Sequence, residues 1–311
     1  MRQNDFYKSL GLTSIVASKR KMNKVLRLAS FEPDFMYERK IDKKGRIYFD
    51  RYKYLGSGFG ISVQGYRHMR KNKEGQRIEK HVVLDWGVFA EGHNDNAVSN
   101  AFMDTDSEQL AYCFVEDVNS GNAFEFRVNN ALEMMDKYKA LRHYDAVLDF
   151  EDDISKVNAA MLMIFGTILL PVVKNEQAIG YRAREEAAHR ELLDRARLGD
   201  TEAEQNLNEI AKKRETDLRE RLANEDLLSV FEGYFLNLIE QSGIFSVLAE
   251  IHEVEELTNE ASNEKLFRLT VSVTGIKMTM YINSEDIVGL PMEGMRIMGM
   301  GQMQGTVLLG Q

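Results

Sequence analysis

Basic and aromatic side chains of the kind that bind nucleic acid gather in the first eighty residues of the chain. Five cations are spaced so that they share one side of a helix: Lys19, Arg20, Lys21, Lys24 and Arg27. A second group flanks polar turns: Arg46, Arg67, Arg70, Lys71, Lys73, Arg77 and Lys80. Tyrosines interleave with them at Tyr48, Tyr52, Tyr54 and Tyr66. Because cations contact phosphates and tyrosine rings stack on bases, the pattern predicts an interface for nucleic acid or another anionic partner.

The charge of the whole chain is divided in the same way. Residues 1–80 hold 20 Lys and Arg against 8 Asp and Glu, a net charge of +12. The remaining residues carry −21, so the chain as a whole carries −9. This asymmetry has two explanations: a basic surface for an anionic partner, or two regions of one protein that attract each other. The sequence leaves both open.

The loop most similar to an enzyme site is WGVFAEGHND, in which Trp86, Glu91, His93 and Asp95 lie close together. An aromatic ring, an imidazole and two carboxylates on one loop are typical of an active site. A strand end followed by a polar turn explains the same residues, and we favour that interpretation. The histidines form no H-x-x-x-H or H-E-x-x-H pair. We therefore assign no catalytic residue, no metal ligand and no cofactor.

Four further patterns have structural explanations. The glycines at 56, 58 and 60 are spaced G-x-G-x-G rather than as in a kinase loop, which indicates a bulge or a tight strand turn. Cys113 lies in an alternating segment and is expected to be a small buried hydrophobe. The acidic cluster at 151–153 is explained by a helix N-terminus. The methionines of residues 292–303 alternate with glycine, which indicates adaptable core packing.

Hydrophobic periodicity predicts an α+β protein in three parts. Residues 1–180 form a mainly antiparallel sheet domain with helices at 4–30 and 130–142. Residues 181–241 form a charged helical connector, in which Gly199 ends one helix and Thr201 with Glu204 caps the next. We expect the apolar segment 226–238 to belong to this connector and to pack into a core. Residues 242–311 alternate as half-buried strands do, which predicts a small antiparallel β-barrel resembling an oligonucleotide/oligosaccharide-binding (OB) barrel.

The longest apolar run extends from 159 to 173 and contains glycine, threonine and proline. It is shorter than the ~20 residues of a membrane span, and we expect a helix or turn followed by a buried strand at 167–173. The first twenty residues have no apolar core of a signal peptide. With a single cysteine in the chain, these features predict a cytoplasmic protein with no membrane partner.

The chain also resembles an uncharacterised Clostridia (Firmicutes) family, a domain of unknown function. The matching stretches are GSGFGISVQGY (56–66), LAYCFVEDVNSGNAFEFRVNN (110–130), GTILLPVV (166–173), RELLDRARLGDTEAEQNL (190–207), DLLSVFEGYFLN (226–237) and the run from SVLAEIHEVEEL to MGQMQGTV (246–307). Their order is preserved, so the resemblance implies one architecture along the whole chain. It implies no activity and no catalytic residues.

Three functions are compatible with these features. Our first hypothesis is a non-enzymatic cytoplasmic binding or adaptor protein that acts through protein–protein contacts of the helical connector and the barrel. The alternative is a nucleic-acid-binding protein that uses the basic N-terminal third and the OB-like barrel. The third is an enzyme whose site includes the loop of His93 and Asp95. The oligomeric state is not predicted.

Overall fold

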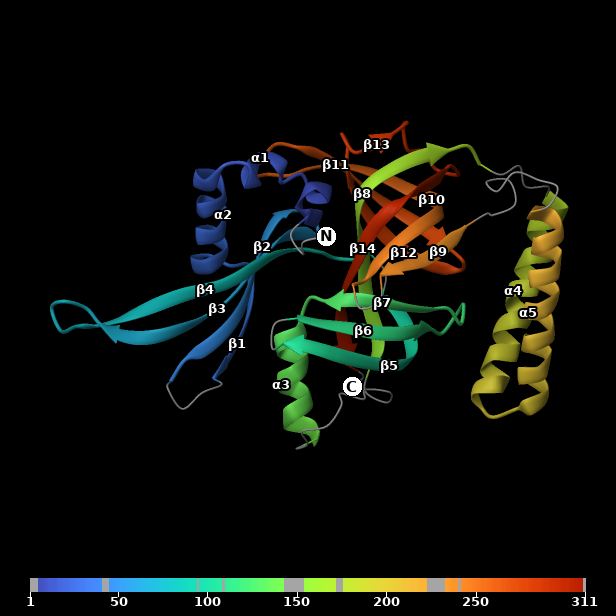
Figure 1. Cartoon of the computed structure of the whole chain (residues 1–311), viewed down its shortest axis with the longest axis horizontal. Helices are drawn as coiled ribbons and strands as arrows, with labels where there is room; N and C mark the ends of the chain where they lie inside the picture. The colour runs from blue at the N-terminus through green and yellow to red at the C-terminus, as the bar shows by residue number, and fades with distance from the viewer. Residues whose placement is uncertain are drawn as a thin grey trace.

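Strands make up most of the molecule, and helices lie at its periphery (Figure 1). The computed structural model describes residues 5–40, 45–93, 95–107, 110–142, 154–171, 176–222, 233–239 and 242–309. The α+β class predicted from the periodicity is confirmed at this level.

The N-terminal part folds into short helices and a four-stranded antiparallel sheet. The helices are η1 (Asp5–Leu10), α1 (Thr13–Val16) and α2 (Lys19–Phe31). The sheet has the order β1-β2-β3-β4, with β1 (Phe35–Lys40), β2 (Ile47–Gly56), β3 (Phe59–Lys71) and β4 (Arg77–Ala90). The Ser18 hydroxyl accepts a hydrogen bond from the Lys21 backbone N–H and so caps α2. The buried side of α2 then packs on β2, β3 and β4.

The second sheet has ten strands drawn from segments far apart in the chain. They are β5 (Asp95–Ser107), β6 (Leu110–Asp117), β7 (Ala123–Val128), β8 (Ile154–Leu169), β9 (Tyr234–Ile239), β10 (Ile244–Thr258), β11 (Lys265–Val273), β12 (Ile276–Asn283), β13 (Ile287–Val288) and β14 (Arg296–Leu309). Helix α3 (Ala131–Arg142) follows β7, where the sequence predicts a helix.

Five of these strands pair in a succession that returns to its start. β10 pairs antiparallel with β11 and with β14, β11 pairs with β12, and β14 pairs with β8. β8 lies parallel to β12. We call β10–β11–β12–β8–β14 the strand ring. Four of its strands lie where the sequence predicts a small barrel, but β8 precedes the helical connector, so the second sheet continues across the predicted boundaries at 180 and 241.

Glycines in β14 allow it to lie against β8 where larger side chains would collide. A Cβ atom at Gly301 would lie 2.6 Å from the carbonyl oxygen of Leu162, and a Cβ atom at Gly299 would meet the carbonyl oxygen of Phe165. The neighbouring methionines are buried to different degrees, from fully buried Met303 to Met292, which is 46% exposed. The repeat of glycine and methionine therefore serves close strand approach as well as core packing.

Two apolar segments differ from the sequence prediction. β8 is a strand over the whole of 154–169, whereas we expected a helix or turn before 167. Both faces of β8 are buried, so its apolar residues do not alternate, and a short apolar run does not distinguish a strand from a buried helix. Of the segment 226–238, the structure describes residues 233–238, and residues 234–238 belong to β9 rather than to a helix. Residues 236–239 are exposed rather than packed into a core.

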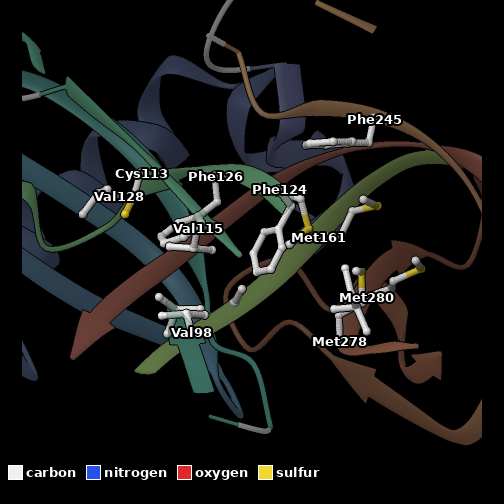
Figure 2. Packing of buried hydrophobic residues seen from close by; sticks show 14 of the residues in the cluster. Val98, Cys113, Val115, Phe124, Phe126, Val128, Met161, Phe245, Met278 and Met280 are labelled. Atoms are coloured by element: carbon white, nitrogen blue, oxygen red, sulfur yellow. The ribbon is translucent and has the colours of Figure 1, made fainter. Parts of the chain in front are cut away.

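Two hydrophobic cores lie on the two faces of β8. Met161 points into an inner core, to which Met163 also belongs (Figure 2). This core fills the strand ring and continues to β5–β7 and α3. Ala160 and Leu162 belong to an outer core, which is formed with the N-terminal helices and β2–β4. The alternation of adjacent β8 residues between the two cores follows from the two-residue period of a strand. Cys113 is fully buried in the inner core, as the sequence predicts.

The charged connector contains a helical hairpin of α4 (Glu176–Arg197) and α5 (Thr201–Leu222) (Figure 1). Gly199 has the positive φ of +84° expected for the residue that ends α4. The cap of α5 is Asp200 rather than Thr201, because the Asp200 carboxylate accepts the N–H groups of Glu202 at 3.0 Å and Ala203 at 3.2 Å. An aspartate satisfies these N–H groups as well as threonine does, so the sequence alone did not distinguish the two caps.

A buried carboxyl group lies where the first sheet meets the second. Asp50 on β2 is 3% exposed, and the Leu132 N–H at the start of α3 donates a hydrogen bond to it. Burial raises the pKa of Asp50 to about 7, although the Leu132 hydrogen bond and the charge of Arg127 act in the opposite direction. Close by, the Tyr52 hydroxyl donates to the Asn129 carbonyl at 2.6 Å. The burial of Asp50 at this junction therefore favours its protonated form.

Titration of Asp50 makes a testable contribution to stability. Between the unfolded pKa of about 4 and the folded pKa of about 7, the folded chain holds a proton that the unfolded chain has released. The free energy of unfolding should therefore fall as pH rises through this window, by up to about 1.4 kcal/mol per pH unit. Asp50→Asn removes this contribution, so denaturant unfolding should show the variant gaining stability relative to the native chain from pH 5 to pH 8. Parallel pH profiles would contradict the assignment, and exposed Glu260→Gln serves as the control.

Candidate nucleic-acid interface

Helix α2 turns a basic side toward solvent. Its apolar side packs inward through Met22, Val25 and Ala29. The remaining positions hold all five cations that the sequence placed on one side, and each is exposed: Lys19, Arg20, Lys21, Lys24 and Arg27. Because the helix contains no acidic residue, this side carries five positive charges.

Beyond α2, strands β3 and β4 continue as a projecting two-stranded ribbon, which we call the arm (residues 67–81; Figure 1). The pairing of β2 with β3 ends at Arg67, so in the described structure the rest of β3 pairs with β4 alone. Asn72 shapes the turn, because its side-chain oxygen accepts the N–H groups of Glu74 at 3.0 Å and Gln76 at 2.9 Å. The arm exposes five further cations: Arg70, Lys71, Lys73, Arg77 and Lys80.

These ten side chains, five on α2 and five on the arm, form what we call the basic surface. Each is exposed, and none contacts an acidic side chain in the described part of the chain. Other cations of the same region are neutralised within the fold: Lys53 pairs with Asp34 at 2.8 Å, and Arg39 pairs with Asp136 at 2.8 Å. The basic surface therefore presents its charge to solvent.

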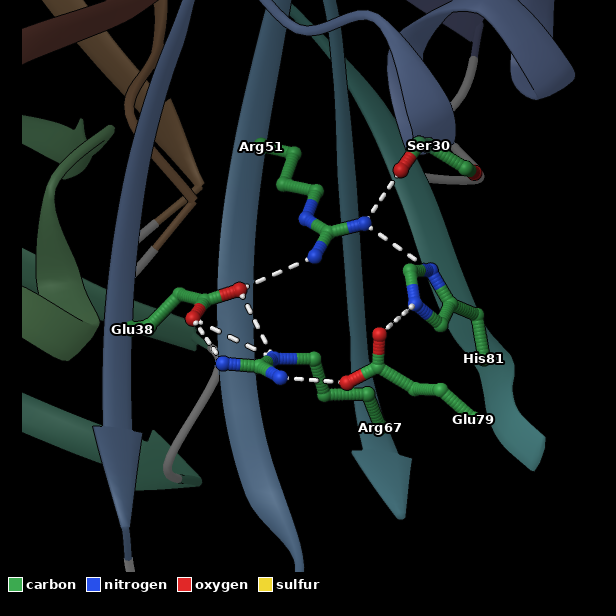
Figure 3. Close-up of polar contacts among 6 residues, drawn as sticks. All are labelled: Ser30, Glu38, Arg51, Arg67, Glu79 and His81. Atoms are coloured by element: carbon green, nitrogen blue, oxygen red, sulfur yellow. Dashed lines mark hydrogen bonds and ion pairs between the residues drawn. The ribbon is translucent and has the colours of Figure 1, made fainter. Parts of the chain in front are cut away.

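A charged network holds the base of the arm against α2 (Figure 3). Glu38 on β1 accepts from Arg51 at 2.9 Å and from Arg67 at 2.8 Å. Arg67 also pairs with Glu79 on β4. Burial acts to raise the pKa of Glu38, but the hydrogen bonds from the two arginines outweigh it and lower this pKa below its usual range. Arg67, which the sequence placed among the binding cations, is thus a structural residue.

His81 joins this network to the end of α2. Its Nδ1 lies 3.0 Å from Arg51, whose guanidinium also donates to the Ser30 carbonyl (Figure 3). The imidazole stacks on Phe31, the last residue of α2, at 5.0 Å between ring centroids. The arm and α2, the two halves of the basic surface, are therefore joined by packed side chains.

The tyrosines that the sequence grouped together fall into two sets. Tyr48 and Tyr66 lie on neighbouring strands, 5.7 Å apart between ring centroids, and Arg46 stands 5.1 Å from the Tyr66 ring. All three are half-buried at the base of the arm. Tyr52, in contrast, is 8% exposed, and Tyr54 donates its hydroxyl proton to Glu91. Tyr52 and Tyr54 therefore join elements of the fold through their hydroxyl groups, whereas Tyr48 and Tyr66 lie beside Arg46 at the base of the arm.

The loop of Trp86, Glu91, His93 and Asp95 does not gather its side chains at one point. Glu91 accepts from Tyr54, and Asp95 accepts from Asn158 at 3.1 Å. The backbone N–H of exposed His93 donates to the Thr279 hydroxyl at 2.8 Å, and Trp86 packs at the edge of the outer core. Within the described residues, no group of three His, Cys, Asp or Glu side chains is arranged to hold a metal. The acidic cluster at 151–153 lies outside the described residues.

The glycines of residues 56–60 form the turn between β2 and β3. Gly58 has a φ of +78°, and a Cβ atom there would lie 3.0 Å from the Tyr281 hydroxyl. The interpretation as a tight strand turn is confirmed, because β2 ends at Gly56 and β3 begins at Phe59, and these two residues pair.

Sequence reasoning missed one cavity, of 790 Å³, that α4 forms with the second sheet. Its lining is polar and consists of Asp95, Asn96, Asp117, Asn119, Ser120, Asn122, His189, Arg190, Thr274, Gly275 and Lys277. These residues come from four separate segments, so no local pattern marks them. Two of its amides bind backbone carbonyls of the cavity wall: Asn122 donates to Thr274 at 2.7 Å and Asn96 to Lys277 at 3.1 Å.

Comparison with known proteins identifies the family. The family model described as "Domain of unknown function, E. rectale Gene description (DUF3881)" matches residues 7–305, nearly the whole chain. The chain therefore belongs to this family, which confirms the resemblance to a clostridial domain of unknown function. No curated protein and no solved structure matches the chain. In the described residues, no helix has the length and apolar character needed to cross a membrane.

The network at the base of the arm predicts a loss of stability when Glu38 is neutralised. Glu38→Gln leaves Arg51, whose side chain is 7% exposed, without its carboxylate partner. We expect the free energy of unfolding to fall by about 2 kcal/mol or more. Glu74→Gln, an exposed position at the tip of the arm, removes the same charge and should change stability by less than about 0.5 kcal/mol. Equal denaturation midpoints for the two variants would show that the network does not hold the arm.

Proposed function

We propose that this member of the DUF3881 family is a non-enzymatic binding protein whose basic surface binds nucleic acid. The observation that carries the proposal is the exposure of ten cations without an acidic partner in the described structure, on a chain whose net charge is −9. Arrays of this kind bind phosphates by releasing condensed counterions. A projecting β-ribbon beside a helix brings the cations to a large ligand without obstruction.

The alternative explanation of the charge asymmetry was attraction between two regions of the same protein. The contacts that the structure describes give it little support. Acidic residues near the first sheet pair with other cations, as Glu38 does with Arg51 and Arg67. The helical hairpin pairs its own charges, as Arg195 does with Asp200 at 2.7 Å. The ten cations of the basic surface are therefore available to an external anion.

The strand ring supports an OB-like barrel, although with one strand displaced in the sequence. In the OB arrangement the last strand lies parallel to the third and antiparallel to the fourth; here β8 holds that place relative to β12 and β14. OB barrels bind ligands on their second and third strands, which correspond to β11 and β12. This face is covered here: Tyr281 is fully buried with its hydroxyl 3.0 Å from the Glu91 carbonyl. We therefore assign binding to the basic surface rather than to the barrel face.

A second candidate function is the protein–protein contact that was our first hypothesis from the sequence. β9 is the end strand of the second sheet, and it exposes Leu236 (57%), Leu238 (48%) and Ile239 (53%). Phe102, which stacks on Phe114, is 46% exposed beside a cavity of 300 Å³ that also reaches Asn237. Edge strands are usually protected by charged residues or proline. An apolar edge strand favours an extended segment of a cytoplasmic partner protein that would add to β9.

Nucleic-acid binding should depend on the α2 cations and on salt. Lys24→Gln with Arg27→Gln removes two phosphate contacts, so fluorescence anisotropy with labelled oligonucleotides at low salt should show an affinity loss of about tenfold. The native chain should lose affinity steeply between 50 and 200 mM salt. Lys212→Gln with Lys213→Gln, on exposed positions of α5, removes the same charge and should bind normally. Absence of binding to any oligonucleotide at low salt would rule out the proposed function.

The contact through β9 makes a separate prediction. Partners captured from a cell extract by the native chain and retained after nuclease treatment should be lost with Leu236→Ser and Leu238→Ser. Both side chains are exposed, so the melting temperature should stay within a few degrees of the native value. Lys24→Gln with Arg27→Gln should retain these partners. Retention by the β9 variant would show that this edge is not a protein contact.

A further inference from the structure

The arm carries cations on both of its faces. Residues directly opposite on paired strands project from the same face, and neighbours along a strand alternate. Lys71 lies opposite Arg77, so these two cations share one face. Arg70 lies opposite Ile78, and Lys80 lies opposite His68, so Arg70 and Lys80 project from the other face. All four cations are exposed.

This arrangement is unfavourable for the isolated arm. Like charges directly opposite each other, as in the pair Lys71 and Arg77, destabilise a hairpin. Their nearest acidic neighbour on the same face, Glu79, already pairs with Arg67. A ribbon lying flat on an anionic surface would need cations on one face alone. Cations on both faces fit a ligand that places a negative wall on each side of the ribbon.

The groove of a nucleic-acid duplex has such walls, because a phosphate backbone runs along each side of it. Two paired strands lie about 4.8 Å apart, and a two-stranded ribbon fits the major groove of B-form DNA, about 12 Å wide. From Arg67 to Lys71 the arm extends about 14 Å, which exceeds the depth of that groove, about 8.5 Å. The major groove of an RNA duplex is too narrow and deep for side chains to read.

Two apolar residues lie among the cations of the arm. Met69 is 60% exposed and Ile78 is 45% exposed, and they project from opposite faces. Apolar side chains in the major groove contact thymine methyl groups and base edges. A basic ribbon with apolar side chains also fits the headgroup region of an anionic membrane, but that surface has one wall rather than two.

We propose that the arm enters the major groove of double-stranded DNA, with one face toward each phosphate backbone, while α2 contacts the adjoining backbone. Phe31 and His81 join α2 to the base of the arm, which places Lys24 and Arg27 beside the point of entry. This inference rests on the proposed function and adds to it the class of nucleic acid and the mode of contact.

The test compares one sequence as a DNA duplex, a DNA single strand and an RNA duplex, by fluorescence anisotropy with the full chain. The native chain should bind the DNA duplex at least tenfold more tightly than the other two. Lys71→Gln with Arg77→Gln, and separately Arg70→Gln with Lys80→Gln, should each weaken duplex binding about tenfold. Each pair should also lower the slope of log K against log salt by about 2, because two phosphate contacts are lost. Met69→Gln with Ile78→Gln should weaken duplex binding without changing the slope.

Different results distinguish the proposed nucleic-acid binding from the proposed entry of the arm into the major groove. If single-stranded DNA or duplex RNA binds as tightly as duplex DNA, or if one face of the arm alone matters, nucleic-acid binding stands and groove entry is wrong. If no oligonucleotide binds but vesicles containing phosphatidylserine do, both claims are wrong and the arm is a membrane contact. Every substituted residue is exposed, so unchanged melting temperatures will show that the variants are folded.

Discussion

The antiparallel pairing of β8 with β14 is the constraint on which the rest of the structure depends. It joins residues 154–169 to residues 296–309 along nearly the full length of both strands. Because both faces of β8 are apolar, one face supports the inner core of the strand ring and the other supports the outer core with α1, α2 and β2–β4. The N-terminal helices and the first sheet are thus held in place by a strand that lies more than sixty residues further along the chain.

Ion pairing and burial separate the structural cations from those available for binding. Arg51, Arg67 and Arg268 are each held by a carboxylate, and Arg268 also donates to the Ser57 carbonyl at 3.0 Å. These arginines join strands and turns, so their desolvation is offset by ion pairs and hydrogen bonds. The ten cations of the basic surface are exposed and contact no acidic side chain among the described residues. A difference in packing, rather than in residue type, therefore distinguishes the two groups.

The same distinction explains how much of the candidate site was predictable. The helical spacing of the α2 cations follows from local sequence, and the structure exposes all five. The turn between β3 and β4 was also predictable, because its residues are polar and contain glycine. The length of the arm was not, since it depends on where β2 stops pairing with β3. Nor was the burial of Tyr52, whose hydroxyl contacts Asn129 in the turn that follows β7.

By itself the sequence determined the elements whose patterns are local: the alternating strands, the helical connector, the turn of residues 56–60 and the basic side of α2. Only the tertiary structure decided that β8 completes the strand ring. Nearly every residue offers the same backbone N–H and C=O groups, so the sequence does not show which strands pair. The tertiary structure also decided which arginines are neutralised, since an ion pair such as Arg67 with Glu38 joins residues on strands that are not adjacent in the chain. Local periodicity indicates which side chains of a segment face solvent. Strand pairing and the neutralisation of charged side chains depend instead on which distant segment lies beside it.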